Sequence, residues 1–587
     1  MDKNLEYKRH TLAHLLALAI RRDFPHALPT IGPAIENGFY YDFDFSGGPA
    51  PKDDDIKNIE KNMKKALSSW KNFSHKSVTA DEARETFKDN LYKTELIDEL
   101  EKAGEEITLY TVGEGHFEFT DLCRGGHCDS PSTDIDIDSF RLTSLAGAYW
   151  RGSEKNPMLT RIYGLAFNTK DELGAYLAQL EEAKKRDHRK IGQEMELFFI
   201  DEMVGKGLVM WLPKGNIIKS EIETFAIESE RKAGYERVST PHIAKEELFL
   251  TSGHLPYYKE DMYPPMEMDD GTYYLRAMNC PHHHRIFQHA PKSYRDFPIR
   301  LAEYGTVYRN ERSGTLAGLL RVRGLDMNDA HIYCRKDQIK EEFKSVLELT
   351  MNHFKTFGLT DYWFRLSKWD PNRMDKYFDE PESWEHAESV IREVLVEMRV
   401  KFIEVDDEAA FYGPKVDVQF KSIIGREETM STIQLDFIAK ERFGLSYIGA
   451  DGQKATDVFV IHRAPLSTHE RFVAFLIEHF GGNFPLWLSP EQIKIIPVSE
   501  VHNAYAAQIY TELKAIGIRA SLDTSNESMG KKIRNAKKDR LPYFVVVGDK
   551  EVEAKNVTLE SRKGESVEMS LSRLGNHLIT EIEAKIL

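Results

Sequence analysis

IRLAEYGTVYRNERSGTLAGLLRVRGLDMNDAHIYC, residues Ile299–Cys334, contains two β-rich runs joined by a short connection. Hairpin-like connections of this kind predict neighbouring antiparallel strands. Further β-rich runs, GTYYLRAMN, STIQLDF and DVFVIHRA, lie on either side, and a long helix is expected from Lys214 to about Gly234. The stretch from about 197 to 487 is therefore predicted to be an α+β domain with an antiparallel sheet and helices packed on it.

A chain of 587 residues is too long for a single core, so several domains are expected. The first 170 residues mix a helix at His10–Arg22 with a strand-like run, GFYYDFDF, at Gly38–Phe45. Lys170–Glu196 has no internal breaker and predicts one long polar linker helix. After Pro490 strands and helices alternate, which predicts a small, mostly parallel α/β domain. The predicted boundaries are 1–170, 171–196, 197–487 and 488–587.

Composition indicates a cytoplasmic protein without a membrane span. No apolar run approaches the length of a bilayer, and the amino terminus lacks a signal-peptide pattern. The few cysteines, Cys123, Cys128, Cys280 and Cys334, favour a reducing compartment. The net charge of −16 does not exclude a nucleic-acid partner, because binding depends on local patches such as Ala183–Lys190 and Met529–Arg540. Each of these basic stretches taken alone is more typical of a solvated helix face.

Cys280 is followed after one proline by three consecutive histidines, in MNCPHHHR. A local metal site is one interpretation, but consecutive side chains splay around the backbone and do not readily close on one ion. His331 and His462 stand alone in apolar, strand-like runs, where a polar ring is costly unless it is bonded. These two histidines are either distant ligands for Cys280 or buried rings satisfied by backbone carbonyls.

Several motifs occur together and in order: NCPHHH, EYGTVYRNERSGTLAGLLRVRG, NDAHIYC, AFYGPKVDV, TIQLDF and VIHRAPLSTHERF. On these motifs the chain resembles bacterial threonyl-tRNA synthetases, a class II family, across essentially its whole length. The resemblance implies a class II catalytic domain, an amino-terminal α+β editing domain and a carboxy-terminal anticodon-binding domain. It implies ligation of L-threonine to tRNA(Thr) with ATP and Mg²⁺, and hydrolysis of mischarged seryl-tRNA.

The resemblance also assigns roles in the catalytic domain. One zinc per subunit is expected on Cys280, His331 and His462. The threonine pocket is expected to contain Asp329, Tyr412, Lys415 and Gln434. ATP is expected to meet Arg309, Glu311, Arg321 and Arg471, and Pro241 falls on the interface through which class II enzymes form homodimers. Surface ion pairs are the ordinary alternative for the arginines.

Both zinc and editing have a physical reason. Threonine and valine are nearly isosteric, and a shape-based pocket separates such pairs only ~10²-fold. A Lewis acid can bind both the amino nitrogen and the hydroxyl of threonine, whereas valine offers it only the amino nitrogen. Serine has both groups, so a second, hydrolytic site is expected. The resemblance places it on His10, His14, Lys93, Asp121, Cys123 and His127, with the cysteine and histidines positioning water rather than binding metal.

The chain departs from the family pattern at several positions. Gly126 stands where the bacterial pattern has proline, and Ser467 replaces the glycine of the third class II motif. Leu325 stands where an adenine-stacking phenylalanine is usual, and Thr429 and Ser431 replace a glutamine and a small residue. A lost aromatic stack is worth ~1 kcal/mol, so weaker ATP binding and altered inhibitor sensitivity are expected.

At the carboxy-terminal end, Asn526 and Glu551 match anticodon-contacting positions, and Glu560 stands where the related pattern has arginine. The helix with Lys184–Lys190 is expected along the acceptor arm of tRNA(Thr). The ubiquitin-like amino-terminal module of many relatives is expected to be absent. Two alternatives remain: a non-catalytic or inhibitor-insensitive paralogue that still binds tRNA, and a zinc hydrolase acting only through the amino-terminal domain.

Overall fold

The two runs of Ile299–Cys334 form strands β15 (Ile299–Tyr308) and β16 (Gly324–Arg335), which pair antiparallel along their whole length. They belong to a computed structural model that describes residues 3–374, 376–422, 425 and 427–587. The chain divides into two compact units, Met1–Glu181 and Glu182–Leu587. In the described part, no helix is both long and apolar enough to span a membrane.

The first unit is built around helix α1 (Lys3–Asp23), whose buried face packs on helix α2 (Ile56–Leu67) and on strand β3 (Gly38–Asp44). The helix predicted from His10 and the strand predicted from Gly38 are thus confirmed. The sheet has the order β1-β3-β8-β7, with β2 paired to β3. The remaining strands of this sheet are β1 (Leu28–Pro29), β2 (Ala34–Ile35), β7 (Phe140–Tyr149) and β8 (Met158–Ala166).

A second, three-stranded antiparallel sheet of the same unit carries the end of the predicted editing motif. Its order is β4-β5-β6, and β6 ends one residue before Cys123. Two helices pack here around Ala83 and Ile97. The elements are β4 (Phe73–Ser77), β5 (Thr108–Val112), β6 (Phe119–Leu122), α3 (Ala80–Thr86), α4 (Leu91–Ala103) and the short α5 (Pro131–Asp134).

The prediction of one continuous linker helix is wrong. The segment forms two helices, α6 (Lys170–Arg186) and α7 (His188–Glu194). Asp187 interrupts them with ψ of 121°, and its carboxylate accepts the backbone N–H of Arg189 at 2.8 Å. Aspartate is a strong N-cap residue, so a new helix begins where the polar pattern alone showed no break.

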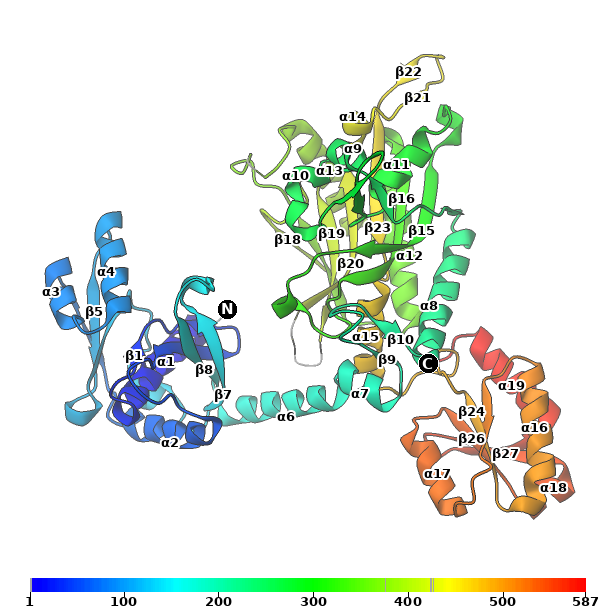
Figure 1. Ribbon diagram of the computed structural model, residues 1–587, viewed down its shortest axis with the longest axis horizontal. Helices are drawn as coiled ribbons and strands as arrows, with labels where there is room; N and C mark the ends of the chain where they lie inside the picture. Colours follow the sequence, from blue (N-terminus) through cyan, green and yellow to red (C-terminus); the bar gives the residue numbers. More distant parts are fainter. Residues whose placement is uncertain (1–2, 375, 423–424, 426) are drawn as a thin grey trace. The chain divides into compact units, whose positions relative to one another are not determined.

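The catalytic sheet of the second unit has the strand order β11-β15-β16-β23-β20-β19-β17-β18. Strands β15, β16, β23, β20, β19 and β18 are labelled in Figure 1. The interior pairs are antiparallel, as predicted, and the two outermost pairs are parallel. The other strands are β11 (Glu236–Arg237), β17 (Tyr362–Ser367), β18 (Phe402–Val405), β19 (Lys415–Lys421), β20 (Glu427–Asp436) and β23 (Val458–Ala464).

Side-chain alternation along these strands separates the core from the functional face. On β16, Ala330 and Ile332 enter the large hydrophobic core, whereas Asp329 and His331 point to the other face. Helices of this unit close the core: α8 (Pro213–Lys232), α12 (Ile339–Thr356), α13 (Pro381–Glu397) and α15 (His469–Phe480). The long helix predicted before Gly234 is α8.

Smaller elements surround the functional face. Helix α11 (Cys280–Gln288) begins at the cysteine of the NCP motif, with Pro281 in its first turn. A small sheet has the order β12-β14-β13. The other elements are α9 (Glu246–Ser252), α10 (His254–Tyr257), α14 (Ala439–Phe443), β9 (Phe198–Phe199), β10 (Met210–Trp211), β12 (Ile243–Lys245), β13 (Met266–Met268), β14 (Gly271–Leu275), β21 (Tyr447–Ile448) and β22 (Lys454–Ala455).

The carboxy-terminal sheet has the order β25-β24-β26-β27-β28. The first three strands are parallel, but β27 and β28 add antiparallel pairs, so the prediction of a mostly parallel sheet was wrong. The elements are β24 (Ile493–Pro497), β25 (Ala520–Leu522), β26 (Tyr543–Val547), β27 (Asn556–Ser561), β28 (Ser566–Ser570), α16 (Asn503–Ala515), α17 (Met529–Lys538), α18 (Asp549–Ala554) and α19 (Leu571–Glu583).

Candidate functional site

A cavity of about 560 Å³ lies over strands β16, β20 and β23 of the catalytic sheet. It brings together residues from segments that are far apart in the chain. All eleven residues expected in ATP, threonine and metal binding line it: Cys280, Arg309, Glu311, Arg321, Asp329, His331, Tyr412, Lys415, Gln434, His462 and Arg471. One concave site of this size, with a few charged groups aimed into it, is the usual form of an enzyme active site.

Three soft metal donors meet at one end of this cavity. His331 on β16 and His462 on β23 are direct partners across the sheet, and Cys280 opens helix α11. Their donor atoms all lie within 4.8 Å of one another. Burial raises the pKa of the Cys280 thiol, and Asp329 and Asp436 raise it further. A thiolate at this position therefore needs a positive partner, and one thiolate with two imidazoles suits zinc.

The three consecutive histidines of α11 are buried and point to different partners. His284 Nδ1 lies 2.9 Å from the hydroxyl of Tyr333, and His283 lies between His331 and a glutamate of β15. The ring nitrogens of His282 have no hydrogen-bond partner among the described residues. A single turn of helix thus sends neighbouring side chains to separate places, as expected from splayed consecutive residues.

The threonine-side residues are already ordered by hydrogen bonds. Asn279 donates to the Asp329 carboxylate at 3.1 Å, and burial raises the pKa of Asp329. Tyr412 donates its hydroxyl to the side-chain oxygen of Gln434. The Lys415 ammonium lies 2.9 Å from the carboxylate of Asp417. These contacts hold the pocket in shape, which is the preorganisation that substrate discrimination needs.

The arginines of the cavity differ in how they are held. Arg321 donates to Glu311 at 2.8 Å, and Arg471 donates from Nε to the carbonyl of Leu320 at 3.1 Å. Among the described residues, none forms a hydrogen bond or ion pair with the Arg309 guanidinium, which lines the cavity. The backbone N–H of Arg309 donates to the carbonyl of Arg323. Arg309 is therefore the cation of the cavity most available to an incoming anion.

The positions that depart from the family pattern divide into two groups. Thr429, Ser431 and Ser467 line the cavity. Leu325 does not: it is 5% exposed and packs with Val307 and Val322, and the expected loss of an adenine stack at this position stays a prediction. Ser467 has φ of 55°, a conformation that costs a residue with a Cβ about 1–2 kcal/mol, which explains why glycine is usual there.

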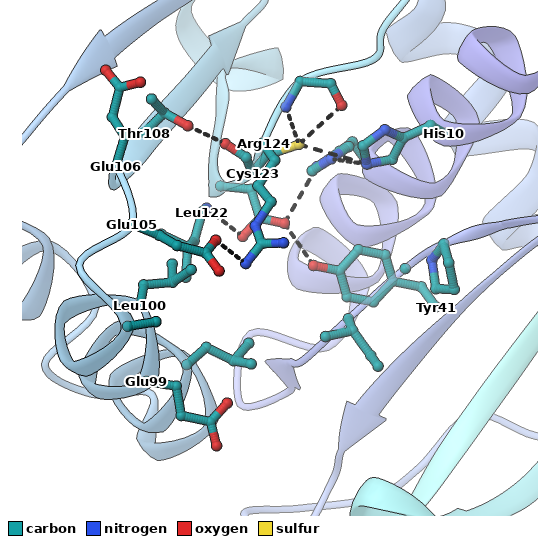
Figure 2. A pocket seen from close by; sticks show the side chains of 18 residues that line it. His10, Tyr41, Glu99, Leu100, Glu105, Glu106, Thr108, Leu122, Cys123 and Arg124 are labelled. Carbon is teal, nitrogen blue, oxygen red and sulfur yellow. Dashed lines mark hydrogen bonds and ion pairs between the residues drawn. The ribbon is translucent and has the colours of Figure 1, made fainter. Parts of the chain in front are cut away.

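A second cavity, of about 510 Å³, lies in the first unit and is lined by His10, His14, Asp121 and Cys123. Figure 2 shows this cavity with His10 and Cys123 labelled. His10 and His14 are one turn apart on α1, and their Nε2 atoms are 3.2 Å apart. The Cys123 sulfur lies 3.6 Å from His10 Nε2 and 3.2 Å from His127 Nε2. The two weak motifs, HxxxH and CxxxH, thus form one cluster.

Asp121 connects this cluster to the remaining predicted residue, Lys93. The Lys93 ammonium lies 2.5 Å from the Asp121 carboxylate, and His14 Nδ1 lies 3.3 Å from it. Tyr41 donates to the same carboxylate at 2.6 Å, with its hydroxyl turned toward the cavity (Figure 2). Sequence analysis missed Tyr41 as a site residue, although GFYYDFDF contained it. Burial opposes ionisation of Asp121, but Lys93 and His14 hold its pKa below the usual range.

The electrostatics of this cluster favour a thiolate beside an imidazolium. Burial would raise the pKa of Cys123, but hydrogen bonds from His10, His127 and His14 hold it well below its ordinary value. Burial would lower the pKa of His14, but Asp121 and Cys123 raise it. Burial lowers the pKa of His127 to about 4, so this ring is neutral near pH 7 and is available as a base. The same four donors lie within 4.8 Å of one another and could also hold a metal ion.

Alkylation of Cys123 distinguishes a free thiolate from a metal-bound one. Because its pKa is lowered, Cys123 is ionised throughout pH 5.5–7.5, and its rate with iodoacetamide should change less than about 2-fold, against about 100-fold for an ordinary thiol. Peptide mass spectrometry measures this rate, with Cys128, whose pKa burial raises to about 11, as the internal comparison. His14→Gln should restore the pH dependence. Reaction only after a chelator is added would instead identify a metal site.

Gly126, where the family pattern has proline, has φ of 85°. Proline holds φ near about −65°, so this loop follows a path that proline cannot adopt. The Gly126 carbonyl nevertheless lies 3.2 Å from His10 Nδ1, and His127 stacks on Phe73 at 4.1 Å. The His127 ring therefore lies within the cluster although the loop follows this different backbone path.

The remaining predicted residues lie on the surface of the second unit. Pro241 is exposed, next to the short edge strand β11. Asn526 is exposed in the loop before α17. The Glu551 carboxylate accepts the N–H of Gly548 at 3.0 Å and the hydroxyl of Thr558 at 3.2 Å, so it caps helix α18 in addition to any contact with RNA.

The eight-stranded sheet, antiparallel except at its two outermost pairs and with arginines and a glutamate over its face, defines a class II aminoacyl-tRNA synthetase. Family models agree: the class II core domain (G, H, P, S and T) matches residues 263–480, and an anticodon-binding domain matches 492–581. The second additional domain of threonyl and alanyl tRNA synthetases matches 107–163.

The chain belongs to the threonine–tRNA ligase family. It is 50% identical over 572 residues to the threonine–tRNA ligases of Staphylococcus carnosus and Staphylococcus aureus (strain JH9), covering 97% of this chain and 87% of each relative. Among solved structures, the RNA binding domain of threonyl-tRNA synthetase from Cryptosporidium parvum Iowa II matches with a TM-score of 0.64 and 34% identity, over 67% of this chain and 98% of that one. A putative threonyl-tRNA synthetase from Aeropyrum pernix matches with a TM-score of 0.60 and 26% identity, over 68% and 97%.

Proposed function

We propose that this chain activates L-threonine with ATP, transfers it to tRNA(Thr), and hydrolyses seryl-tRNA(Thr) in its first unit. The single observation behind the synthetic activity is the convergence of eleven predicted residues on one cavity. The non-catalytic paralogue is not favoured, because a protein that only binds tRNA has no use for this complete set. A zinc hydrolase confined to the first unit leaves the second unit without a role.

In the synthetic site, a threonine carboxylate oxygen attacks the α-phosphorus of ATP, and the bond to the leaving pyrophosphate breaks. Arg309 is assigned to the α-phosphate and the threonine carboxylate, and Arg321 and Arg471 to the more distant phosphates. Mg²⁺ enters with ATP. Glu311 is assigned to the adenine amino group. Arg321 donates to one oxygen of the Glu311 carboxylate, and the other oxygen can accept a hydrogen bond from adenine.

Cys280, His331 and His462 would hold one zinc ion per subunit. Bound there, zinc supplies a Lewis acid for the amino nitrogen and hydroxyl of threonine. Asp329, on the same face of β16 as His331, accepts a hydrogen bond from the threonine hydroxyl. Its carboxylate is buried, so it favours threonine over valine, whose side chain has no hydrogen-bond donor. Tyr412 and Gln434 close the pocket around the side chain.

In the first unit, neutral His127 and the Cys123 thiolate are placed to orient and activate water for attack on the seryl ester. Lys93 would offer its charge to the ester oxygen or to the terminal ribose. Serine and threonine both carry a hydroxyl, so hydrogen bonds to this group cannot distinguish them in the editing site. Threonine is excluded from that site by its extra methyl group, a difference worth about 1–3 kcal/mol.

Further parts of the proposal concern partners and location. Homodimerisation is proposed through the exposed segment around Pro241, where Ile243 is also 37% exposed. Anticodon contacts are proposed at Asn526 and Glu551, and acceptor-arm contacts at Lys184–Lys190. A cytoplasmic location accords with free cysteines at all four positions.

Threonine-dependent ATP–pyrophosphate exchange tests the synthetic proposal, with valine and serine as comparison substrates. The exchange rate with threonine should exceed the rate with valine by far more than the ~10²-fold that shape alone allows. It should exceed the rate with serine by only about 10–200-fold. Absence of any exchange would support the paralogue. For the editing site, Cys123→Ala should raise the yield of seryl-tRNA(Thr) without changing exchange. Cys128→Ala, at a buried thiol that lies 3.4 Å from the hydroxyl of Thr11 on α1, is the matched control.

A further inference from the structure

The middle residue of the histidine run, His283, is fully buried between two elements of the catalytic sheet. Its Nδ1 lies 2.8 Å from Nδ1 of His331, and its Nε2 lies 3.0 Å from the carboxylate of Glu303. His331 and Glu303 stand on the neighbouring strands β16 and β15. One imidazole therefore links a proposed zinc ligand to a buried carboxylate.

The order of donors and acceptors along this link follows from the carboxylate. An ionised carboxylate only accepts hydrogen bonds, so His283 Nε2 carries the proton and donates it to Glu303. In the neutral ring, Nδ1 of His283 then has a free lone pair and accepts from Nδ1–H of His331. His331 is thereby left with an unprotonated Nε2, the only nitrogen it can offer to a metal.

The far end of the link is fixed. Glu303 accepts the backbone N–H of Thr240 at 2.9 Å and the Thr240 hydroxyl at 2.8 Å, and Arg276 lies 3.4 Å from it. The carboxylate is thus oriented independently of His283. The second proposed histidine ligand is arranged similarly, since His462 Nε2 lies 3.2 Å from Asp436 and leaves Nδ1 free.

We propose that His283 is a positioning residue that holds His331 in the metal-binding tautomer through a Glu303–His283–His331 relay. This inference rests on the proposed zinc site. A metal-bound histidine commonly donates its other N–H to a neighbouring acceptor, and loss of such an acceptor weakens metal binding about 10–100-fold. Here the acceptor is a second histidine, which gives the second residue of the HHH run a role distinct from those of its neighbours.

Two amide substitutions separate positioning from packing. In His283→Asn the amide oxygen stands near the position of Nδ1 and can accept from His331. In His283→Gln the amide reaches toward Glu303 and satisfies it, but His331 loses its acceptor. Zinc dissociation constants of the full chain, measured by competition with a chromophoric chelator, should be about 10–100-fold weaker for His283→Gln and within about 3-fold of wild type for His283→Asn.

A purely structural role predicts the opposite order, since only the asparagine variant leaves Glu303 without its ring donor. The inference is overturned if His283→Gln binds zinc like wild type, or if His283→Asn is as weak as His283→Gln. His282→Gln, the same change at a buried neighbour that has no hydrogen-bond partner among the described residues, is the control and decides the result if the asparagine variant does not fold. If Cys280→Ser leaves the zinc content unchanged, the proposed zinc site itself fails, which is a different outcome.

Discussion

Arg309→Ala is expected to lower threonine-dependent ATP–pyrophosphate exchange by about 10³-fold, the loss typical of removing a preorganised cation that meets developing phosphate charge. The expectation is large because the Arg309 guanidinium lines the cavity and is not engaged by another described group. Arg321 and Arg471 cannot replace it, since each is held by a neighbour. Exchange kinetics at saturating threonine, with ATP varied, measure the effect.

Arg312→Ala is the matched control. Arg312 stands three residues further along the same segment, its side chain is 87% exposed, and its nearest acid, Glu260, is 3.9 Å away. An exposed pair of this kind is worth little, so exchange should stay within about 2-fold of wild type. Hydrolysis of seryl-tRNA(Thr) by Arg309→Ala should be unchanged. Equal losses in both arginine variants would mean that general positive charge, not the position of Arg309, promotes the reaction.

The antiparallel pairing of the central strands was predictable because β15 and β23 are rich in β-branched and aromatic residues and β15 is joined to β16 by a short connection. The gathering of Cys280, His331 and His462 was not predictable from the residues alone. It depends on the register that sets His331 opposite His462, a property of the paired strands rather than of either one. Only the resemblance to a family selected these two histidines from the others.

Other features depended on short-range chemistry that a pattern does not show. The helix break at Asp187 results from one side chain capping a backbone N–H. The antiparallel strands β27 and β28 follow the parallel part of their sheet without a change in composition. Tyr41 and His283 act through hydrogen bonds to residues 80 and 48 positions away, to Asp121 and His331 respectively. Partners at such distances along the chain appear only once the sheets are assembled.

Cys280→Ser is expected to reduce the zinc content from about one equivalent per chain to a small fraction of an equivalent. Loss of a group that only contacts a metal ligand weakens metal affinity about 10–100-fold, and loss of a direct ligand weakens it more. A serine hydroxyl is a poorer zinc ligand than a thiolate, and the described members of the cluster include no second cysteine. Threonine activation should fall, and the preference for threonine over valine should shrink toward the ~10²-fold limit of shape. Elemental analysis and exchange with both amino acids measure these effects.

Cys334→Ser provides the control, since Cys334 stands on the same strand as His331 but is fully buried in the hydrophobic core. It should lower stability without changing the zinc content. Cys123→Ser should also leave the content near one equivalent, because the first-unit cluster is proposed to act through a thiolate. A wild-type content near two, falling by one in each of Cys280→Ser and Cys123→Ser, would show that both clusters hold metal. Full activity with Cys280→Ser and no zinc would remove the metal from threonine recognition altogether.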